Sequence, residues 1–596
     1  MMKKFLLVVC GSFVGVILAL TFFVIATILF SLSIASMGGG KATSVEKHSI
    51  LHLDLDGEIA ERPATPSPTM ADLASGSMPS EATGLNMLVK AIDDAATNDK
   101  IDGIYLECNG AMAAPATLTA LRKALKNFKT KTEGKKFIYA FANQGYGQGD
   151  YYLASVADSL FVNPEGALDL HGMASSIPYL KRLMEKVGVE MQVVRVGTFK
   201  SAVEPYMLDS ISPANRLQTE HYLGSIWGEI SNEIAADRKI APERLNSLVD
   251  SILITRSAQE IVDLGLLDGI CFRKDFEKKL KALTEVDEDD DLALVSPSEL
   301  VTDLDTPASG EHIAVLYAVG EIDDDDSDMN DDAIHGEKMV EIIDELAKDD
   351  NVKGLVLRVN SPGGSAFASE QIWKALDDFK AAGKPLAVSM GDYAASGGYY
   401  ISSGAGRIFA EPTTITGSIG IFGTIPCMQE LMEDKLGVHI SVVKTNKNSD
   451  MGLMTKRLTP SQLAALQQMV NRGYDLFTKR CADGRGVSQD SIKVIAEGRV
   501  WDGKSALKIG LVDELGGLDE AIAWVANEAG LDKDCDTQCY PSLEENWKAM
   551  VTKMMNAQAE VRMADEMGLF YDYYKELRQT LGRDHVLCLM FDRVTL

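Results

Sequence analysis

The chain has 596 residues, of which 46% are hydrophobic and 24% charged, and its formal net charge is −29 at pH 7. This length suggests three or four units of ordinary size. The 87 acidic residues outnumber the 58 basic ones, which disfavours a nucleic-acid partner because phosphate binding needs a basic face. The cysteines and histidines form no cluster with zinc-ligand spacing, so the sequence predicts neither a metal nor another cofactor.

The N-terminal segment is apolar. Residues 5–37 contain no charged side chain. As a helix they would extend about 50 Å, against about 30 Å of bilayer hydrocarbon. We therefore predict a membrane span over residues 5–30, within an anchor segment of residues 1–40, and the two lysines before it place the N-terminus in the cytoplasm. A cleaved signal peptide ending near Ala35 is the alternative, although its apolar core is normally only about 7–15 residues long.

The rest of the chain repeats itself. The segment "IDGIYLECNG" from Ile101 matches "VKGLVLRVNS" from Val352, and "GDYYLASVADSLFV" from Gly149 matches "GGYYISSGAGRIFA" from Gly397. A third segment, "LMEKVGVEMQVVRVGTFKS" from Leu183, matches "LMEDKLGVHISVVKTNKNS". Self-similarity that keeps the same order and spacing indicates a duplicated domain.

Each copy alternates short, continuous apolar strands with amphipathic helices. This pattern is typical of a buried, mostly parallel sheet covered by helices, so the predicted fold class is α/β. We place the first domain at residues 41–295 and the second at residues 296–545. The remaining tail, residues 546–596, is helical by its pattern and would pack on a domain or mediate assembly.

The two copies differ at the positions that carry chemistry. Ser396, in "AASGGYY", aligns with Gln148 of the first copy, and the loop "NSPGG" aligns with "NGAMA". Conversely, Lys200 in "GTFKSA" aligns with Ser449 of the second copy, with Lys447 two residues away. One copy thus holds a candidate nucleophile and the other a candidate base.

A serine hydroxyl is a weak nucleophile until a neighbouring base takes its proton, and a neutral lysine amine can replace histidine in that role. A free lysine has a pKa near 10.4, and holding it neutral at pH 7 costs roughly 4–5 kcal/mol. Burial in an apolar site can supply a shift of this size. Val196 and Phe199 before Lys200, and Ala202 and Val203 after it, provide apolar neighbours for such a site.

Gly363 and Gly364 follow an apolar strand and precede a helix. Without Cβ atoms, their N–H groups can approach a ligand closely, which suits an oxyanion hole, and Gly397 directly after Ser396 offers another backbone N–H. Each feature also has a structural reading: a tight helix start for "AASGG", a turn for "SPGG" and a surface position for Lys200. The first copy lacks the serine and the double glycine, and the second copy lacks the lysine. This reciprocal loss favours the catalytic interpretation of all three features.

Five motifs together resemble the signal peptide peptidase A family, in the long, duplicated, membrane-anchored form of the protease IV family. They are "LRVNSPGGS", "MGDYAASGGYYIS", "TGSIGIFG", "GTFKSAVEPY" and "GRVWDGKSALKIGLVDELGG". The resemblance implies tandem domains with a ClpP/crotonase-like fold, a ββα superhelix. It also implies a serine endopeptidase that uses a Ser-Lys dyad to degrade signal peptides after signal peptidase has released them.

This resemblance assigns roles to single residues. Ser396 matches the family's nucleophile, Lys200 its general base, and Ser418 in "TGSIG" the hydroxyl that orients the lysine. Gly363 and Gly364 match the oxyanion-hole glycines, with Gly397 as a further candidate.

The resemblance also implies partners. These are signal peptides and other apolar peptides, the bacterial inner membrane with the catalytic domains on its periplasmic side, and a homo-oligomer of four chains whose open side faces the bilayer. Three alternatives remain: a general envelope quality-control peptidase, a crotonase-like acyl-CoA enzyme with a carboxylate acid/base, and a non-catalytic membrane scaffold. The sequence does not decide whether Lys200 meets Ser396 within one chain or across two.

Overall fold

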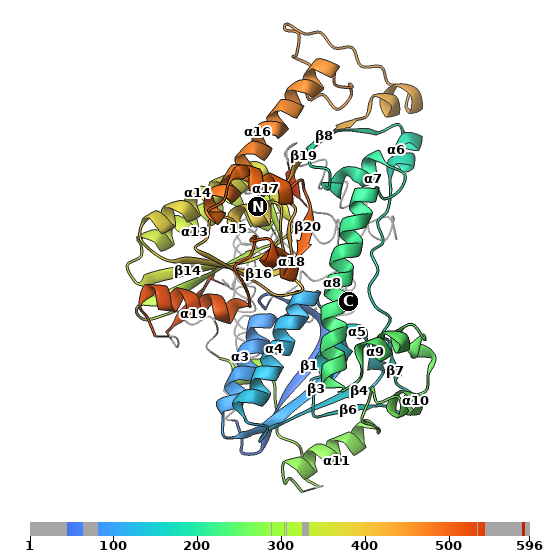
Figure 1. The fold of residues 1–596 in the computed structure, drawn as a ribbon, viewed down its shortest axis with the longest axis vertical. Helices are drawn as coiled ribbons and strands as arrows, with labels where there is room; N and C mark the ends of the chain where they lie inside the picture. The colour runs from blue at the N-terminus through green and yellow to red at the C-terminus, as the bar shows by residue number, and fades with distance from the viewer. Residues whose placement is uncertain are drawn as a thin grey trace, which may run out of the picture.

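Two β-sheets built mainly from parallel strands, one in each copy of the repeat, form the framework of the molecule (Figure 1). The computed structural model describes residues 45–63, 82–287, 289–302, 304, 307–324, 333–532, 535–542 and 587–589. The predicted membrane anchor and most of the predicted helical tail lie outside these residues. Within the described part of the chain, no helix combines the length and the apolar character that crossing a bilayer requires.

The N-terminal sheet has helices on both faces. Its strands run in the order β10 (Leu294–Val295), β1 (Ser49–Ala60), β3 (Ile101–Met112), β4 (Phe137–Ala142), β6 (Ser159–Val162) and β9 (Gly269–Ile270), and β2 (Thr83–Gly84) pairs with β1. Helices α3 (Leu85–Thr97) and α4 (Pro115–Lys131) pack on one face, and α11 (Arg273–Leu283) packs on the other through Phe276. This double cover explains why the strands are continuous apolar runs.

The C-terminal sheet repeats this layering. Its strands run in the order β20 (Val500–Asp502), β18 (Ile415–Gly417), β16 (Leu386–Ala395), β14 (Val352–Ser361), β11 (His312–Val319) and β22 (Thr537–Tyr540), while β17 (Arg407–Ala410) pairs with β16 and with β21 (Glu514–Leu515). Helices α13 (Gly336–Lys348) and α14 (Ala366–Ala381) cover one face and α19 (Leu518–Ala529) the other. The predicted α/β class and the duplication are confirmed.

A third sheet joins the two domains. Its strands run in the order β13 (Ala333–His335), β12 (Glu321–Asp323), β15 (Gly363–Ser365), β23 (Leu587–Leu589), β19 (Ile421–Cys427) and β8 (Glu190–Val196). Strand β8 belongs to the N-terminal copy but pairs antiparallel with β19 of the C-terminal copy along its whole length. Strand β23 is the described piece of the tail, and it is extended where the pattern predicted helix.

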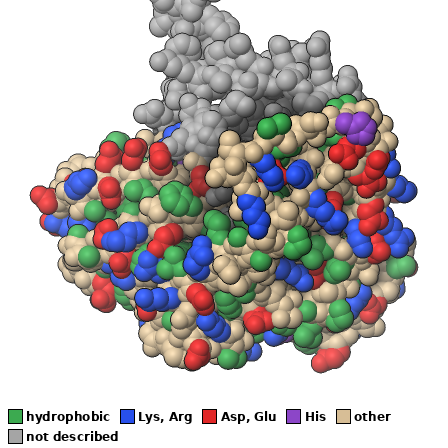
Figure 2. Space-filling view, turned by 90° about the horizontal axis from the view of Figure 1, so that it is seen from above, with side chains coloured by type: hydrophobic (Ala, Val, Ile, Leu, Met, Phe, Trp, Pro, Cys, Tyr) green, Lys and Arg blue, Asp and Glu red, His purple; other side chains and the backbone are tan. Residues whose placement is uncertain are grey.

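Two long helices flank the third sheet. Helix α8 (Pro213–Asp237) follows the N-cap Ser212, whose hydroxyl accepts from Asn215 N, and α16 (Pro460–Arg485) follows Thr459 in a capping box. A proline in the first turn of each helix starts it without losing a backbone bond. In Figure 1, α8 runs vertically beside both domains and α16 rises from the C-terminal one. On the upper face, shown in Figure 2, hydrophobic side chains lie exposed among acidic and basic ones.

Buried polar groups also connect the domains. Glu61, directly after β1, accepts from Arg358 of β14 at 2.9 and 3.0 Å, and both side chains are buried. Asp392 of β16 accepts from the backbone N and the hydroxyl of Thr117 at 2.8 and 2.6 Å. Asn360 Nδ2 lies within 3.2 Å of both Glu61 and Asp392. A buried charge that loses its partner is costly, so this network favours one relative placement of the domains.

Glu411, directly after β17, makes stability depend on pH. Its side chain is buried, and burial raises its pKa from 4.5 to about 7. Between these values the folded protein binds more protons than the unfolded chain, so this residue lowers the unfolding free energy as pH rises through that window. We expect Glu411→Gln to match the wild type at pH 4.5 and to be more stable by about 3 kcal/mol at pH 8.

Thermal denaturation of the wild type and of Glu411→Gln at the two pH values measures this difference in stability. A stabilisation that appears only at the higher pH supports the assignment, and an equal difference at both would contradict it. The exposed Glu165 gives a matched control, because Glu165→Gln should change neither midpoint.

Candidate active site

Ser396 lies at a sharp turn between β16 and α15 (Gly397–Ser402). Its backbone has φ 56° and ψ −113°, a sparsely populated conformation for a residue with a side chain. Its N–H donates to Gly417 O at 2.8 Å, its carbonyl accepts from Tyr400 N at 2.9 Å, and the residue is fully buried. Strain of this kind persists only where the surroundings enforce it, and it presents the hydroxyl at the end of the strand.

Strand β8 brings Lys200 to this hydroxyl from the other domain. The Lys200 Nζ lies 2.7 Å from Ser396 Oγ, and it lies 3.1 Å from both the carbonyl oxygen and the hydroxyl of Ser418. The lysine is 1% exposed, and the Phe422 ring centre is 5.9 Å from Nζ. The structure therefore brings together, within one chain, three side chains that the sequence separates by 196 and 218 residues.

The loop that carries Lys200 is held against the C-terminal domain. Phe199 N donates to Glu497 O at 2.9 Å. A Cβ on Gly498 would lie 2.7 Å from Lys200 N and Cβ, so only glycine permits this approach. Buried Gln218 of α8 donates to Phe199 O at 3.2 Å, and its carbonyl oxygen accepts from Val500 N at 3.1 Å. Sequence reasoning missed Gln218, because a polar residue on a helix has no pattern that marks it as buried.

Ser418 sits at another strained position, between β18 and β19. Its φ is 50°, it is buried, and its N–H donates to Arg499 O at 2.7 Å. Its hydroxyl and its carbonyl oxygen therefore both face Lys200 Nζ from a fixed backbone. This arrangement restrains the amine beside Ser396.

The three candidate oxyanion-hole glycines differ in where their N–H groups lie. Gly363 N donates to Ser361 Oγ at 3.2 Å. Gly364 has φ 158°, and its N lies beside Gly397, since a Cβ on Gly397 would be 3.1 Å from that nitrogen. A Cβ on Gly364 would lie 2.0 Å from the carbonyl oxygen of Ile322. Gly364 and Gly397 thus meet next to Ser396, while the N–H of Gly363 is engaged elsewhere.

An extended strand fits beside these glycines. Strand β23 pairs antiparallel with β15, with Gly364 opposite Cys588 and Ser365 opposite Leu587, and its Leu587 also pairs with Phe422 of β19. The edges of β15 and β19 can therefore hold a peptide backbone between them, directly next to Gly364.

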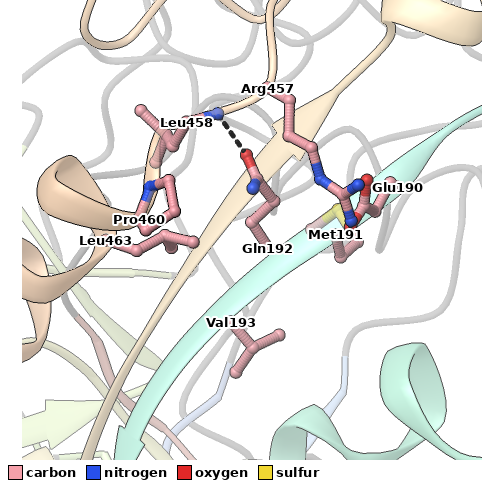
Figure 3. Close-up of a pocket in the computed structure, with 8 residues that line it drawn as sticks. All are labelled: Glu190, Met191, Gln192, Val193, Arg457, Leu458, Pro460 and Leu463. Atoms are coloured by element: carbon pink, nitrogen blue, oxygen red, sulfur yellow. Dashed lines mark hydrogen bonds and ion pairs between the residues drawn. The ribbon is translucent and has the colours of Figure 1, made fainter.

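The far end of β8 is also fixed in the C-terminal domain. Figure 3 shows a pocket there, where Gln192 of β8 accepts from Leu458 N at 2.9 Å and Glu190 forms an ion pair with Arg457. Leu463 of α16 lines the same pocket. This pocket lies at the opposite end of β8 from Lys200, so its visible contacts position the strand and do not reach the serine.

The first copy of the repeat has lost the equivalent site. Gln148 occupies the position of Ser396, is buried, and accepts from the backbone N–H groups of His171 and Gly172 at 3.2 and 2.8 Å. Its amide also donates to Gly172 O at 3.1 Å. These contacts use the polar atoms of the side chain for structure, so of the two equivalent positions, 148 and 396, only the second carries a Ser–Lys pair.

Comparisons with known proteins identify the family of this chain. The model of peptidase family S49 matches residues 129–287 and 378–532, one stretch in each copy of the repeat. Protease 4 of Salmonella typhi is 36% identical over 86% of this chain and 84% of its own length, and Protease 4 of Haemophilus influenzae is 35% identical over 82% and 80%. Serine protease SPPA, chloroplastic, of Arabidopsis thaliana is 28% identical over 82% and 70%.

Among solved structures, a ClpP1 mutant from Listeria monocytogenes matches 35% of this chain and 93% of its own, at 15% identity and a TM-score of 0.24. That similarity is too low to bear on the fold. The family match and the Protease 4 relatives instead cover both halves of the repeat, including Lys200 in the first and Ser396 in the second. The chain therefore belongs to peptidase family S49 and is a serine endopeptidase.

Proposed function

We propose that Ser396 is the nucleophile of this peptidase and that Lys200 is its general base, oriented by Ser418. The observation that carries the proposal is the 2.7 Å contact between Lys200 Nζ and Ser396 Oγ, formed by side chains of two domains. Each of these residues is missing from the other copy of the repeat. An amine can accept the serine proton only when it is neutral, and burial in an apolar environment favours that form.

Catalysis then follows as acyl transfer. Lys200 takes the proton of Ser396, and the alkoxide attacks the carbonyl carbon of the substrate peptide. Lys200 gives that proton to the leaving amine as the C–N bond breaks, which leaves an ester on Ser396. A water molecule, deprotonated by Lys200, attacks this ester and releases the acid product, and the proton returns to Ser396.

The oxyanion of each tetrahedral intermediate needs preorganised donors. We assign this role to the backbone N–H groups of Gly364 and Gly397, which meet beside Ser396. Gly363 contributes to the oxyanion hole through its backbone conformation, with φ 107°. It is not a donor, because its own N–H points to Ser361. Of the three glycines expected from the sequence, Gly364 and Gly397 are therefore the proposed donors.

Substrates would bind as an added strand between β15 and β19. Strand β23 supports this because its backbone pairs with both edges. Main-chain pairing of this kind accepts many sequences, while pockets for alternate side chains select among them. Apolar, extended peptides fit such a groove, and signal peptides are peptides of this class.

The setting of the enzyme is part of the same proposal. Residues 1–40 would form an uncleaved anchor with its span at residues 5–30 in the bacterial inner membrane, and the two ClpP/crotonase-like domains would lie on the periplasmic side. Four chains would assemble over the bilayer where released signal peptides emerge. A general envelope quality-control peptidase is the second candidate, since a groove built on backbone pairing does not by itself exclude other apolar peptides.

The two candidate functions, signal peptide degradation and general quality control, predict different substrate preferences. The full chain, reconstituted in lipid vesicles, would be given a synthetic signal peptide and an equally apolar segment from the core of an unfolded soluble protein. A preference for the signal peptide of roughly tenfold or more in kcat/KM supports the first candidate. Equal rates for the two peptides would favour quality control, and no cleavage of either would contradict both.

Ser418→Ala tests the orienting role. Removing the hydroxyl leaves Lys200 Nζ with less restraint, and we expect kcat to fall roughly 10- to 100-fold with KM nearly unchanged. Ser418→Cys keeps a hydrogen-bonding atom in place without the β-branch that the φ of 50° disfavours, and it should recover part of the rate. Steady-state kinetics on a fluorogenic peptide separates kcat from KM, and a loss confined to KM would show that Ser418 only binds substrate.

A further inference from the structure

Gln218 of α8 joins the loop that carries Lys200 to strand β20 of the C-terminal domain. Helix α8 lies beside β20 (Figure 1), and the Gln218 side chain is fully buried there. Its Nε2 lies 3.2 Å from Phe199 O and 3.0 Å from Ser201 Oγ, so it reaches the residues on both sides of the lysine. Its Oε1 accepts from Val500 N at 3.1 Å. One amide therefore holds parts of both domains.

Strand β20 also holds the two serines of the site. Val500 pairs with Gly417, whose carbonyl oxygen accepts from Ser396 N at 2.8 Å. The carbonyl oxygen of the preceding residue, Arg499, accepts from Ser418 N at 2.7 Å. The strand that the glutamine contacts is thus the strand that fixes the nucleophile and the hydroxyl beside the lysine.

The neighbours of Gln218 leave its amide one orientation. Buried Glu204 accepts from Asn215 Nδ2 at 3.2 Å, which turns Asn215 Oδ1 toward Gln218 Nε2 at 3.0 Å. At the other end the amide oxygen faces Val500 N, a group that can only donate. A flipped amide would set donor against donor and acceptor against acceptor. The donor end is therefore fixed toward the lysine loop and the acceptor end toward β20.

The second copy of the repeat links this glutamine to the lysine. Helices α8 and α16 each follow a Ser or Thr N-cap and begin with proline, and the sixth residue after the N-cap is Gln218 in α8 and Ala465 in α16. Ala465 is exposed. The second copy also has Ser449 at the position of Lys200. The glutamine and the lysine therefore occur in the same copy and are both missing from the other, as expected of a residue that serves the base.

We propose that Gln218 is a positioning residue for the general base. It sets the 2.7 Å separation of Lys200 Nζ and Ser396 Oγ by holding the lysine loop and β20 in one hydrogen-bonded unit. The inference rests on the proposed roles of Lys200 and Ser396. Gln218 acts through the backbone that carries these residues and takes no proton itself. The substrate groove lies between other strands, β15 and β19, so peptide binding should depend little on the glutamine.

Two substitutions of Gln218 test this role. Gln218→Met keeps the length of the side chain without its polar atoms. Gln218→Asn keeps the amide, which secures folding, but is one methylene too short to reach both Phe199 and Val500. Because a misplacement of about 1 Å can cost about 10²-fold in rate, we expect kcat to fall roughly 10- to 100-fold with KM nearly unchanged. Steady-state kinetics of the full-length chain in detergent, on a fluorogenic peptide, measures both constants. Unchanged kcat in both variants, or a loss confined to KM, would overturn the proposal.

Ser225 gives a matched control. It lies seven residues after Gln218 on the same face of α8, and its hydroxyl donates to buried Asp502 of β20 at 2.8 Å. Ser225→Ala thus also removes a bond between α8 and β20, but a bond that does not involve the loop of Lys200. This variant should lower the thermal midpoint and leave kcat unchanged. If it lost as much activity as the Gln218 variants, a general loosening of the interface would explain both effects and the proposal would be wrong.

A double-variant cycle shows whether Gln218 acts through the lysine. Fluorophosphonate labelling of Ser396 should slow roughly 10- to 100-fold in Gln218→Asn, whereas the same substitution should cause no further slowing in Lys200→Met. Equal slowing in both backgrounds would mean that Gln218 acts on the serine or on the fold, and would overturn this inference alone. Labelling of Lys200→Met at the wild-type rate would overturn the proposed function, and this inference with it.

Discussion

Replacing Ser396 with alanine, or Lys200 with methionine, is expected to lower kcat for peptide cleavage by roughly 10⁴-fold or more. Ser396→Ala removes the atom that attacks the substrate. Lys200→Met keeps most of the buried volume but removes the amine 2.7 Å from that atom, so the hydroxyl loses its proton acceptor. The two losses should not add in the double variant, because the residues act as one unit. Single-turnover assays on a fluorogenic peptide measure all three.

Two exposed positions give matched controls. Lys274→Met, on α11 at the far side of the N-terminal domain, and Ser298→Ala, exposed on the short helix α12 (Pro297–Leu300), should keep full activity. Substantial cleavage by either active-site variant would mean that another side chain carries the nucleophile or the base. A loss of folding is checked by the thermal midpoint, which Ser396→Ala should change little.

Gly364→Ala is expected to reduce kcat by roughly 10²- to 10³-fold, the effect of losing one oxyanion donor. The added Cβ would lie 2.0 Å from Ile322 O and 2.6 Å from Ile322 N, which are backbone atoms that cannot swing aside. With φ at 158°, the position also disfavours any side chain. The strand β15 must therefore shift, and the N–H of Gly364 moves away from Ser396 and Gly397.

Gly383 provides the control for this substitution. Its φ is 87°, but a Cβ added there would have no atom within 4 Å. Gly383→Ala therefore introduces comparable backbone strain without a clash near the site, and it should leave kcat unchanged while lowering the thermal midpoint slightly. If both variants lost the same activity, general strain and not the oxyanion donor would explain the effect of Gly364→Ala.

Much of the fold could be predicted because the repeat compares the chain with itself. Continuous apolar strands indicated a covered parallel sheet, and the structure confirms the α/β class. The reciprocal differences at Gln148 and at Ser449 directed attention to Ser396 and Lys200, which the structure brings into contact. Each of these differences lies within a short stretch of sequence. Because the duplication aligns the two copies, the differences together predicted that two distant residues, Ser396 and Lys200, act as a pair.

Other parts depend on tertiary structure that no local pattern encodes. Nothing in "VEMQVVRV" indicates that this strand leaves its own domain and pairs with β19, although that exchange decides whether the site forms within one chain. The glycines Gly363 and Gly364 look alike in sequence, and only their neighbours show that one N–H faces Ser361. The tail pattern predicted helix, whereas its described piece, β23, is a strand in a groove that supplies pairing edges on both sides.

Ser396 is the proposed nucleophile, and Lys200, from the other domain, is proposed to activate it. Labelling the full-length chain with a fluorophosphonate, followed by mass spectrometry of its peptides, tests this directly. We expect an adduct on Ser396 and a labelling rate that falls by roughly 100-fold or more in Lys200→Met. An adduct on another residue, or equally fast labelling of Ser396 without the lysine, would contradict it.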